Sequence, residues 1–176
     1  TLWHTLSLHD ALPICCSRSG TTWLGRLLAV NRRVANLGEA HFGAELAAGN
    51  HEHVERRLAS ASGSALLVEK TPANVYHLDE LARWFPVLRV ILMIRDPRAV
   101  AASMLDATAW ARARQGFDIE RAARLWVRAM EEAERAKQWL GRRMLEVRYE
   151  VLQADTASTL ACIVQQLGWS VPASSI

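Results

Sequence analysis

Residues 17–23, with the sequence Ser-Arg-Ser-Gly-Thr-Thr-Trp, contain the residue types that bind an oxyanion. They follow a short apolar run and precede a helical pattern in which Leu24, Leu27 and Leu28 recur. In such a turn, backbone N–H groups and the positive end of the helix dipole attract anions. Arg18 adds a forked cationic donor to the turn. The pattern therefore indicates a site for a phosphate or a sulfate group.

The same turn departs from the phosphate-binding loop of nucleotide hydrolases, GxxxxGK[ST]. When Gly20 is aligned with the second glycine of that loop, Cys15 stands at the first glycine and Thr21 at the lysine. Because both diagnostic residues are absent, the sequence argues against ATP or GTP hydrolysis. A turn that only caps a helix and binds nothing remains the alternative.

A second group of polar residues follows the most apolar run of the chain, residues 89–94. Arg95 comes directly after this run, and Ser103 lies eight residues further on, along the next predicted helix. Ligands bind at the carboxyl ends of strands in parallel sheets, so Arg95 and Ser103 could share one phosphate. The alternative is purely structural: Asp96 caps a helix, Arg98 faces solvent and Ser103 is a small packing residue.

Apolar periodicity and breaker residues predict the elements that position these groups. Strands alternate with helices along the chain, which favours an α/β fold with a parallel sheet. Strands are expected at residues 13–16, 65–68, 89–94 and 144–147, and a loop at 31–36. Helices are expected at residues 20–30, 38–48, 51–57, 72–84, 96–105, 118–140 (with an apolar stripe that includes Trp126) and 155–167.

Composition limits the classes of function. The chain has 176 residues and a net charge of +3 without a run of basic residues, which fits one domain and argues against a nucleic-acid surface. Its three cysteines give neither a disulfide framework nor the spacing of a metal site, so a reducing compartment, the cytoplasm, is expected. No apolar segment is long enough to predict a membrane span.

Both ends of the sequence are unusual. Residues 5–14 resemble a peptide that arises when sequencing-adapter DNA is translated, and the first residue is Thr1 rather than methionine. We therefore expect residues 1–14 to be foreign to the protein. Residues 15–176 are expected to form a single domain that is truncated at its C-terminus.

Taken together, the two motifs resemble the sulfotransferase family that uses 3′-phosphoadenosine 5′-phosphosulfate (PAPS), in particular its bacterial and tyrosylprotein branches. The first family motif, Pro-Lys/Arg-Ser-Gly-Thr-Thr, is matched by residues 18–22, and the second, Arg-Asp-Pro-Arg with a serine eight residues after its first arginine, by Arg95 and Ser103. The resemblance runs from residue 15 to residue 169 and implies a P-loop-like three-layer fold with a central parallel sheet flanked by helices. Further landmarks are Glu69-Lys70-Thr71-Pro72, Phe85-Pro86 and Arg148-Tyr149-Glu150.

The resemblance implies a role for each motif in transferring a sulfuryl group from PAPS to an acceptor hydroxyl. Arg18 would stabilise charge on the bridging oxygen, Arg95 and Ser103 would hold the 3′-phosphate, and Tyr149 would contact the nucleotide. In-line displacement needs mainly positioning and charge stabilisation, so no metal is expected. The residues that would hold the 5′-phosphosulfate together with Arg18 are Ser19, Gly20, Thr21, Thr22 and Trp23.

An acceptor hydroxyl also needs a general base. Glu39 is preferred, because Gly38-Glu39 resembles the glutamate-bearing segment of the tyrosylprotein and bacterial branches; His41 is the alternative. Lys70 is expected to assist the leaving group. The structural alternatives are a glutamate at a helix start, a surface histidine and a solvated lysine.

Two departures from the family pattern leave other functions open. Ser17 replaces the usual proline, and the glycine-rich, lysine-containing segment near the family's C-terminus is missing. The alternatives are a P-loop-like nucleotide or small-molecule kinase and a non-catalytic nucleotide-binding fragment. The acceptor class (carbohydrate, peptide, lipid or small molecule) and the oligomeric state have no sequence signature.

Overall fold

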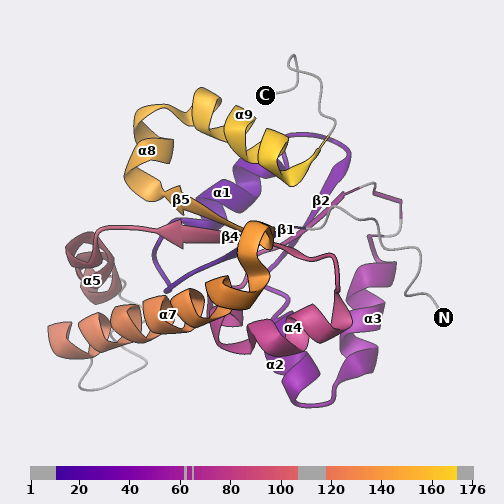
Figure 1. The fold of residues 1–176 in the computed structure, drawn as a ribbon, viewed down its shortest axis with the longest axis horizontal. Helices are drawn as coiled ribbons and strands as arrows, with labels where there is room; N and C mark the ends of the chain where they lie inside the picture. Colours follow the sequence, from indigo (N-terminus) through magenta and orange to yellow (C-terminus); the bar gives the residue numbers. More distant parts are fainter. Residues whose placement is uncertain (1–10, 62, 65, 107–117, 170–176) are drawn as a thin grey trace.

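The fold is built on a parallel sheet. The computed structural model describes residues 11–169 except 62, 65 and 107–117, and within these residues five strands pair in the order β2-β3-β1-β4-β5 (Figure 1). All four pairings are parallel, which agrees with the predicted α/β class. The strands are β1 (Ala11–Ile14), β2 (Val34–Gly38), β3 (Leu66–Glu69), β4 (Arg89–Ile94) and β5 (Met144–Arg148).

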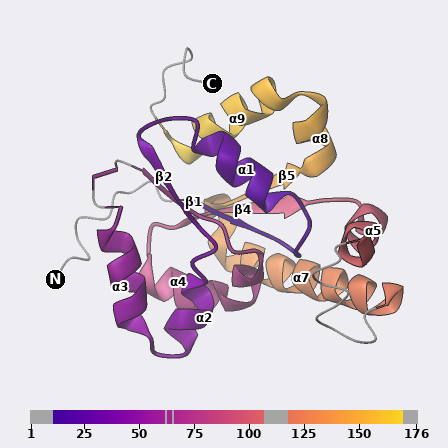
Figure 2. The same cartoon turned by 180° about the vertical axis from the view of Figure 1, so that it is seen from behind.

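Helices cover both faces of the sheet and give a three-layer arrangement. One face carries α1, α8 and α9, and the opposite face carries α2, α3, α4 and α7 (Figures 1 and 2). A 3₁₀ helix, η2 (Pro72–His77), leads into α4, and a second, η3 (Gly141–Arg143), leads into β5. The helices are α1 (Thr21–Leu28), α2 (Phe42–Ala47), α3 (His51–Ala59), α4 (Leu78–Trp84), α5 (Pro97–Asp106), α7 (Ile119–Leu140), α8 (Tyr149–Ala154) and α9 (Thr156–Leu167).

The apolar run at residues 89–94 forms β4 over the residues predicted from sequence. Its four inner residues are buried, because helices cover both faces of the sheet and both neighbours are strands. The caps of the last two long helices are also confirmed: Asp118 accepts from the Arg121 N–H at the start of α7, and Asp155 accepts from the Ser158 N–H at the start of α9. Gly168 ends α9 in the left-handed conformation.

Other boundaries differ from the prediction. The expected loop at 31–36 was wrong in its second half, because Val34–Gly38 is the edge strand β2. Its sequence, Val-Ala-Asn-Leu-Gly, contains two residues that usually favour turns, so it lacks the pattern of a strand. Residues 72–84 form η2 followed by α4 rather than one helix, and α8 was not predicted.

Strand β1 begins and ends earlier than predicted and lies at the centre of the sheet. Ala11–Ile14 pairs with β4 over all four of its residues, and all four are buried. Three residues of the segment expected to be foreign, Ala11, Leu12 and Ile14, thus belong to the hydrophobic core. The foreign origin of residues 1–14 and the truncation at the C-terminus stay predictions.

Candidate active site

Each of the five strands delivers a polar or aromatic residue to the same edge of the sheet. Because the strands are parallel, their carboxyl ends meet there. The next residues along the chain are, in sheet order, Glu39 after β2, Lys70 after β3, the turn at 15–20 after β1, Arg95 after β4 and Tyr149 at the end of β5.

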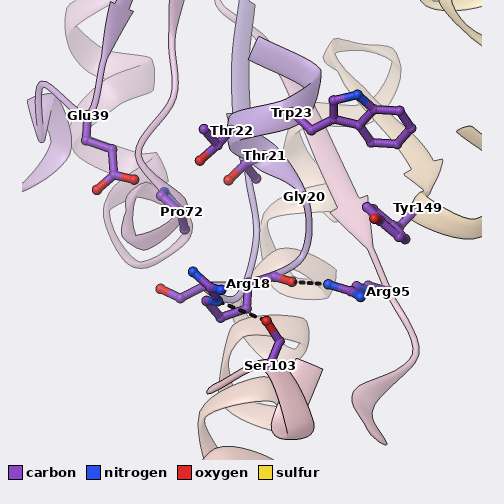
Figure 3. Close-up of a pocket in the computed structure, with 11 residues that line it drawn as sticks. Arg18, Gly20, Thr21, Thr22, Trp23, Glu39, Pro72, Arg95, Ser103 and Tyr149 are labelled. Carbon is purple, nitrogen blue, oxygen red and sulfur yellow. Dashed lines mark hydrogen bonds between the residues drawn. The ribbon is translucent and has the colours of Figure 1, made fainter. Parts of the chain in front are cut away.

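A pocket of about 300 Å³ opens at this edge (Figure 3). Glu39 and Pro72 stand on one side of it, Trp23 and Tyr149 on the other, and Arg18 and Ser103 close a third side. The pocket therefore joins the two motifs found in the sequence. Its lining residues are Ser17, Arg18, Gly20, Thr21, Thr22, Trp23, Glu39, Pro72, Arg95, Ser103 and Tyr149.

The turn after β1 has the backbone of an anion-binding loop. Arg18 and Gly20 both have positive φ, 73° and 94°, and Gly20 is the N-cap of α1. Gly20 has no side chain and makes no capping hydrogen bond, so it leaves the first N–H groups of α1 uncapped, as in helix N-termini that bind anions. The Ser19 hydroxyl is fully buried and has no hydrogen-bond partner among the described residues.

The second motif packs directly on this turn. Arg95 donates from Nη1 to the carbonyl oxygen of Arg18 at 2.9 Å, and Arg18 donates from Nε to Ser103 Oγ at 3.0 Å. Trp126 of α7 donates from Nε1 to the Arg95 carbonyl oxygen at 3.2 Å. The two arginines, 77 residues apart in sequence, thus lie together at one end of the pocket, and α7 supports Arg95.

Aromatic residues complete this end of the pocket. The Arg95 guanidinium carbon lies 4.3 Å from the centre of the Tyr149 ring, a cation–π contact. Trp23 meets Tyr149 edge to face, with ring centres 5.6 Å apart. A Cβ on Gly20 would lie 2.7 Å from Tyr149 Cε2 and closer still to Cδ2, so the turn needs glycine for space as well as for its φ.

The other end of the pocket holds an ion pair between Lys70 and Glu39. The Lys70 side chain is 7% exposed, whereas the Glu39 side chain is 48% exposed. The buried lysine is therefore paired with a half-exposed carboxylate that lines the pocket. Glu39 can accept a proton at this position, and Lys70 can neutralise a developing negative charge.

A buried carboxylate lies next to this pair. Glu69 is 3% exposed and accepts hydrogen bonds from the Ala40 N–H, the Thr71 hydroxyl and the Asn74 amide. Burial raises the pKa of Glu69 to about 7, although these hydrogen bonds act in the opposite direction. Glu69 lies outside the lining of the pocket.

The remaining charges of the Arg-Asp-Pro-Arg motif lie outside the pocket lining. Hydrogen bonds from the Arg98 side chain and backbone hold the pKa of Asp96 at about 2. Arg98 is 90% exposed, and the Asp96 N–H donates to Glu150 Oε1 at 2.9 Å. These contacts order the turn after β4, which agrees with the structural alternative for Asp96 and Arg98.

The predicted site residues come together with three exceptions. Ser19 belongs to the turn but its side chain is buried outside the pocket lining, Lys70 reaches the site through Glu39, and His41 is an exposed residue outside the pocket lining. Sequence reasoning did not predict that Trp126 supports Arg95. It also gave no role in the pocket to Ser17, which precedes Arg18 and lines the pocket. An indole N–H aimed at a strand end has no sequence signature, because it depends on how α7 packs.

Comparison with known proteins identifies the family. A model of the sulfotransferase family matches residues 51–173. The chain belongs to the sulfotransferase family. The match includes Lys70, Arg95, Ser103 and Tyr149 and begins after Arg18 and Glu39. No curated protein sequence matches this sulfotransferase significantly.

Solved structures share the fold of this sulfotransferase at low sequence identity. The sulfotransferase domain from the curacin biosynthetic pathway is 17% identical, with a TM-score of 0.74 over 92% of this chain and 74% of that chain. The domain from the Synechococcus PCC 7002 olefin synthase is 19% identical, with a TM-score of 0.73 over 94% and 75%. Mouse sulfotransferase SULT7A1 complexed with PAP is 15% identical, with a TM-score of 0.62 over 97% and 64%.

Among the described residues there is no group of three or more His, Cys, Asp and Glu side chains that could hold a metal ion. In the same part of the chain, no helix combines the length and the apolar character needed to cross a membrane.

Proposed function

We propose that this sulfotransferase uses PAPS as its donor and transfers the sulfuryl group to an acceptor hydroxyl, with Glu39 as general base. One observation carries the proposal: a single pocket has two arginines and a helix N-terminus at one end and, at the other, Glu39 with the buried Lys70 paired to it from behind the pocket lining. The first end suits an anionic donor and the second suits deprotonation of a hydroxyl.

The residues at the first end fit a donor with two anionic groups. The N–H groups at the start of α1, which Gly20 leaves uncapped, would bind the 5′-phosphosulfate together with the Thr21 and Thr22 hydroxyls. Arg95 and Ser103 would bind the 3′-phosphate, and Trp23 with Tyr149 would contact the nucleotide. The mouse structure of the same fold contains PAP, the product that PAPS leaves behind, which supports this choice of donor.

The protein would act by positioning and by stabilising charge. PAPS supplies the sulfuryl group; its sulfur–oxygen bond to the phosphate breaks as a new bond forms to the acceptor oxygen. Glu39 takes the proton of the acceptor hydroxyl. Arg18, which touches Ser103 in this structure, would turn toward the bridging oxygen and stabilise its negative charge. Lys70 orients Glu39 and adds a second positive charge.

Transfer of labelled sulfate tests the proposal. Purified protein is incubated with ³⁵S-labelled PAPS and, separately, with a phenol, a monosaccharide, a tyrosine peptide and a sterol, and with γ-labelled ATP as the competing donor. We expect transfer from PAPS to at least one acceptor and none from ATP. Transfer from ATP alone, or from neither donor, would contradict the proposal.

Two matched variants test the assignment of Glu39. Glu39→Gln keeps the shape of the side chain and removes the base, so turnover should fall at least about a hundredfold while PAP binding persists. Glu52→Gln, an exposed residue on α3, should leave turnover unchanged. Unchanged turnover in Glu39→Gln would remove Glu39 from the mechanism.

A further inference from the structure

We propose that Glu69 is a positioning residue for Glu39: its buried carboxylate fixes the backbone of residues 39–43, so that the Glu39 carboxylate faces the pocket. The inference rests on the proposed role of Glu39 as general base. Glu69 itself lies outside the pocket lining and would act only through this segment.

Two consecutive residues of the chain hold Glu39 from both sides. The Lys70 N–H donates to the Gly38 carbonyl oxygen at 2.8 Å, on the residue before Glu39. The Ala40 N–H, on the residue after Glu39, donates to Glu69 Oε1 at 3.1 Å. Because both neighbours of Glu39 are anchored to the end of β3, its backbone position is set by that strand.

The side chains of Thr71 and Asn74 also fix the backbone at the start of α2. The His41 N–H donates to Thr71 Oγ1 at 3.0 Å, and the Gly43 N–H donates to Asn74 Oδ1 at 3.1 Å. Thr71 and Asn74 in turn both donate to Glu69. Three backbone N–H groups of one segment are therefore tied, directly or through one side chain, to a single carboxylate.

The network has a fixed direction of hydrogen bonding. Glu69 accepts three donors, and Asn74 presents its amide nitrogen to Glu69 and its amide oxygen to Gly43. If Glu69 were an amide, its nitrogen would face the Asn74 nitrogen, and turning Asn74 over would place that nitrogen against the Gly43 N–H. With asparagine at position 74, all of these hydrogen bonds form only if both terminal atoms of the side chain at position 69 are acceptors.

The segment needs such a hold because its conformation is strained. His41 has a φ of 55°, a left-handed conformation that costs a residue with a Cβ free energy. Glu69, Thr71 and Asn74 are all less than 4% exposed, so an unpaired group there would be costly. The strained residue His41 is linked through Thr71 to the buried Glu69 carboxylate. This arrangement is expected where buried hydrogen bonds must keep a segment in one conformation.

Two variants test this hydrogen-bond direction: the single variant Glu69→Gln and the double variant Glu69→Gln/Asn74→Asp. In the single variant we expect faster hydrogen exchange at the Ala40, His41 and Gly43 amides and a fall in kcat of at least about tenfold. The dissociation constant for PAP should stay within about twofold, because the network does not line the pocket. In the double variant the new amide donates to the new carboxylate, so exchange and kcat should return to within about threefold of wild type.

Thr71→Val and Thr71→Ser provide an independent matched pair. Thr71→Val removes the acceptor of the His41 N–H and should lower kcat, whereas Thr71→Ser keeps the hydroxyl and should not. The inference is overturned if Glu69→Gln keeps wild-type exchange and kcat. A failure of the double variant to recover while both proteins remain folded by circular dichroism also overturns it.

These outcomes are separable from a failure of the proposed function. If Glu39→Gln keeps full turnover, the role of Glu39 is wrong, whatever Glu69→Gln does. If Glu39→Gln is inactive but Glu69→Gln is not, Glu39 is the base and the positioning role of Glu69 is wrong. Turnover is measured on the acceptor that the panel assay identifies; hydrogen exchange and PAP binding need no acceptor.

Discussion

Replacing Gly20 by alanine should damage both the stability of the protein and its anion site. Gly20 has a φ of 94°, a conformation that residues with a Cβ rarely adopt. The added carbon would meet Tyr149 at 2.7 Å from Cε2 and closer at Cδ2, and would lie 3.7 Å from Met93 Cε. Tyr149 must therefore move, and it is the ring on which the Arg95 guanidinium lies.

The magnitude follows from these two contributions. A left-handed backbone costs a residue other than glycine about 1–2 kcal/mol. Forcing an extra carbon into a packed contact costs about 1–3 kcal/mol more. We expect a loss of roughly 2–5 kcal/mol in the free energy of unfolding, and a Tm lower by roughly 6–15 °C at about 3 °C per kcal/mol for a chain of this size. PAP binding should weaken at least about tenfold, because the turn and Arg95 move together.

Gly25 provides a matched control five residues along the chain. It lies within α1, where a Cβ would meet Asn36 Nδ2 at 3.4 Å and Lys70 Cβ at 3.5 Å. Gly25→Ala should be neutral or stabilising by about 0.5–1 kcal/mol, because alanine favours helix. Thermal unfolding by circular dichroism and titration calorimetry with PAP measure both variants. Equal stability and equal PAP affinity in the two variants would refute the reasoning.

Three further predictions concern the supports of the fold and site. Trp126→Phe removes the donor to the Arg95 carbonyl and should cost about 1 kcal/mol of stability while weakening PAP binding, both measurable in the same assays. Asp118→Ala removes the N-cap of α7 and should cost about 1 kcal/mol in urea unfolding without changing PAP affinity. Burial raises the pKa of Glu69 from 4.5 to about 7, so the native state binds more protons than the unfolded chain in this window. Stability should therefore fall by about 3 kcal/mol as the pH rises from 4.5 to above 7, and Glu69→Gln should remove that part of the pH dependence.

The fold was predictable where one strong local pattern decided the structure. A continuous apolar run suffices for β4, and an aspartate before an amphipathic stretch suffices for α7. The edge strand β2 could not be predicted in the same way. Its sequence has turn-forming residues and no alternation, and it is a strand because β3 is available to pair with it.

The site was predictable where its residues lie at strand ends. Arg95 follows a recognisable strand, so its place in the pocket follows from the rule for parallel sheets. The network around Glu69 was not predictable, because its partners Ala40 and Asn74 come from segments on either side of β3. Glu69 and Ala40 are 29 residues apart, and only the folded chain shows that they meet.

Binding of PAP compared with AMP is the most direct test of the central claim. The two nucleotides share adenosine and a 5′-phosphate and differ by the 3′-phosphate, for which Arg95 and Ser103 are the proposed ligands. One charge-assisted hydrogen bond contributes about 1.5–3 kcal/mol, so PAP should bind at least about tenfold more tightly than AMP. Ser103→Ala should reduce this difference. Equal affinity for PAP and AMP would contradict the assignment of the pocket to PAPS.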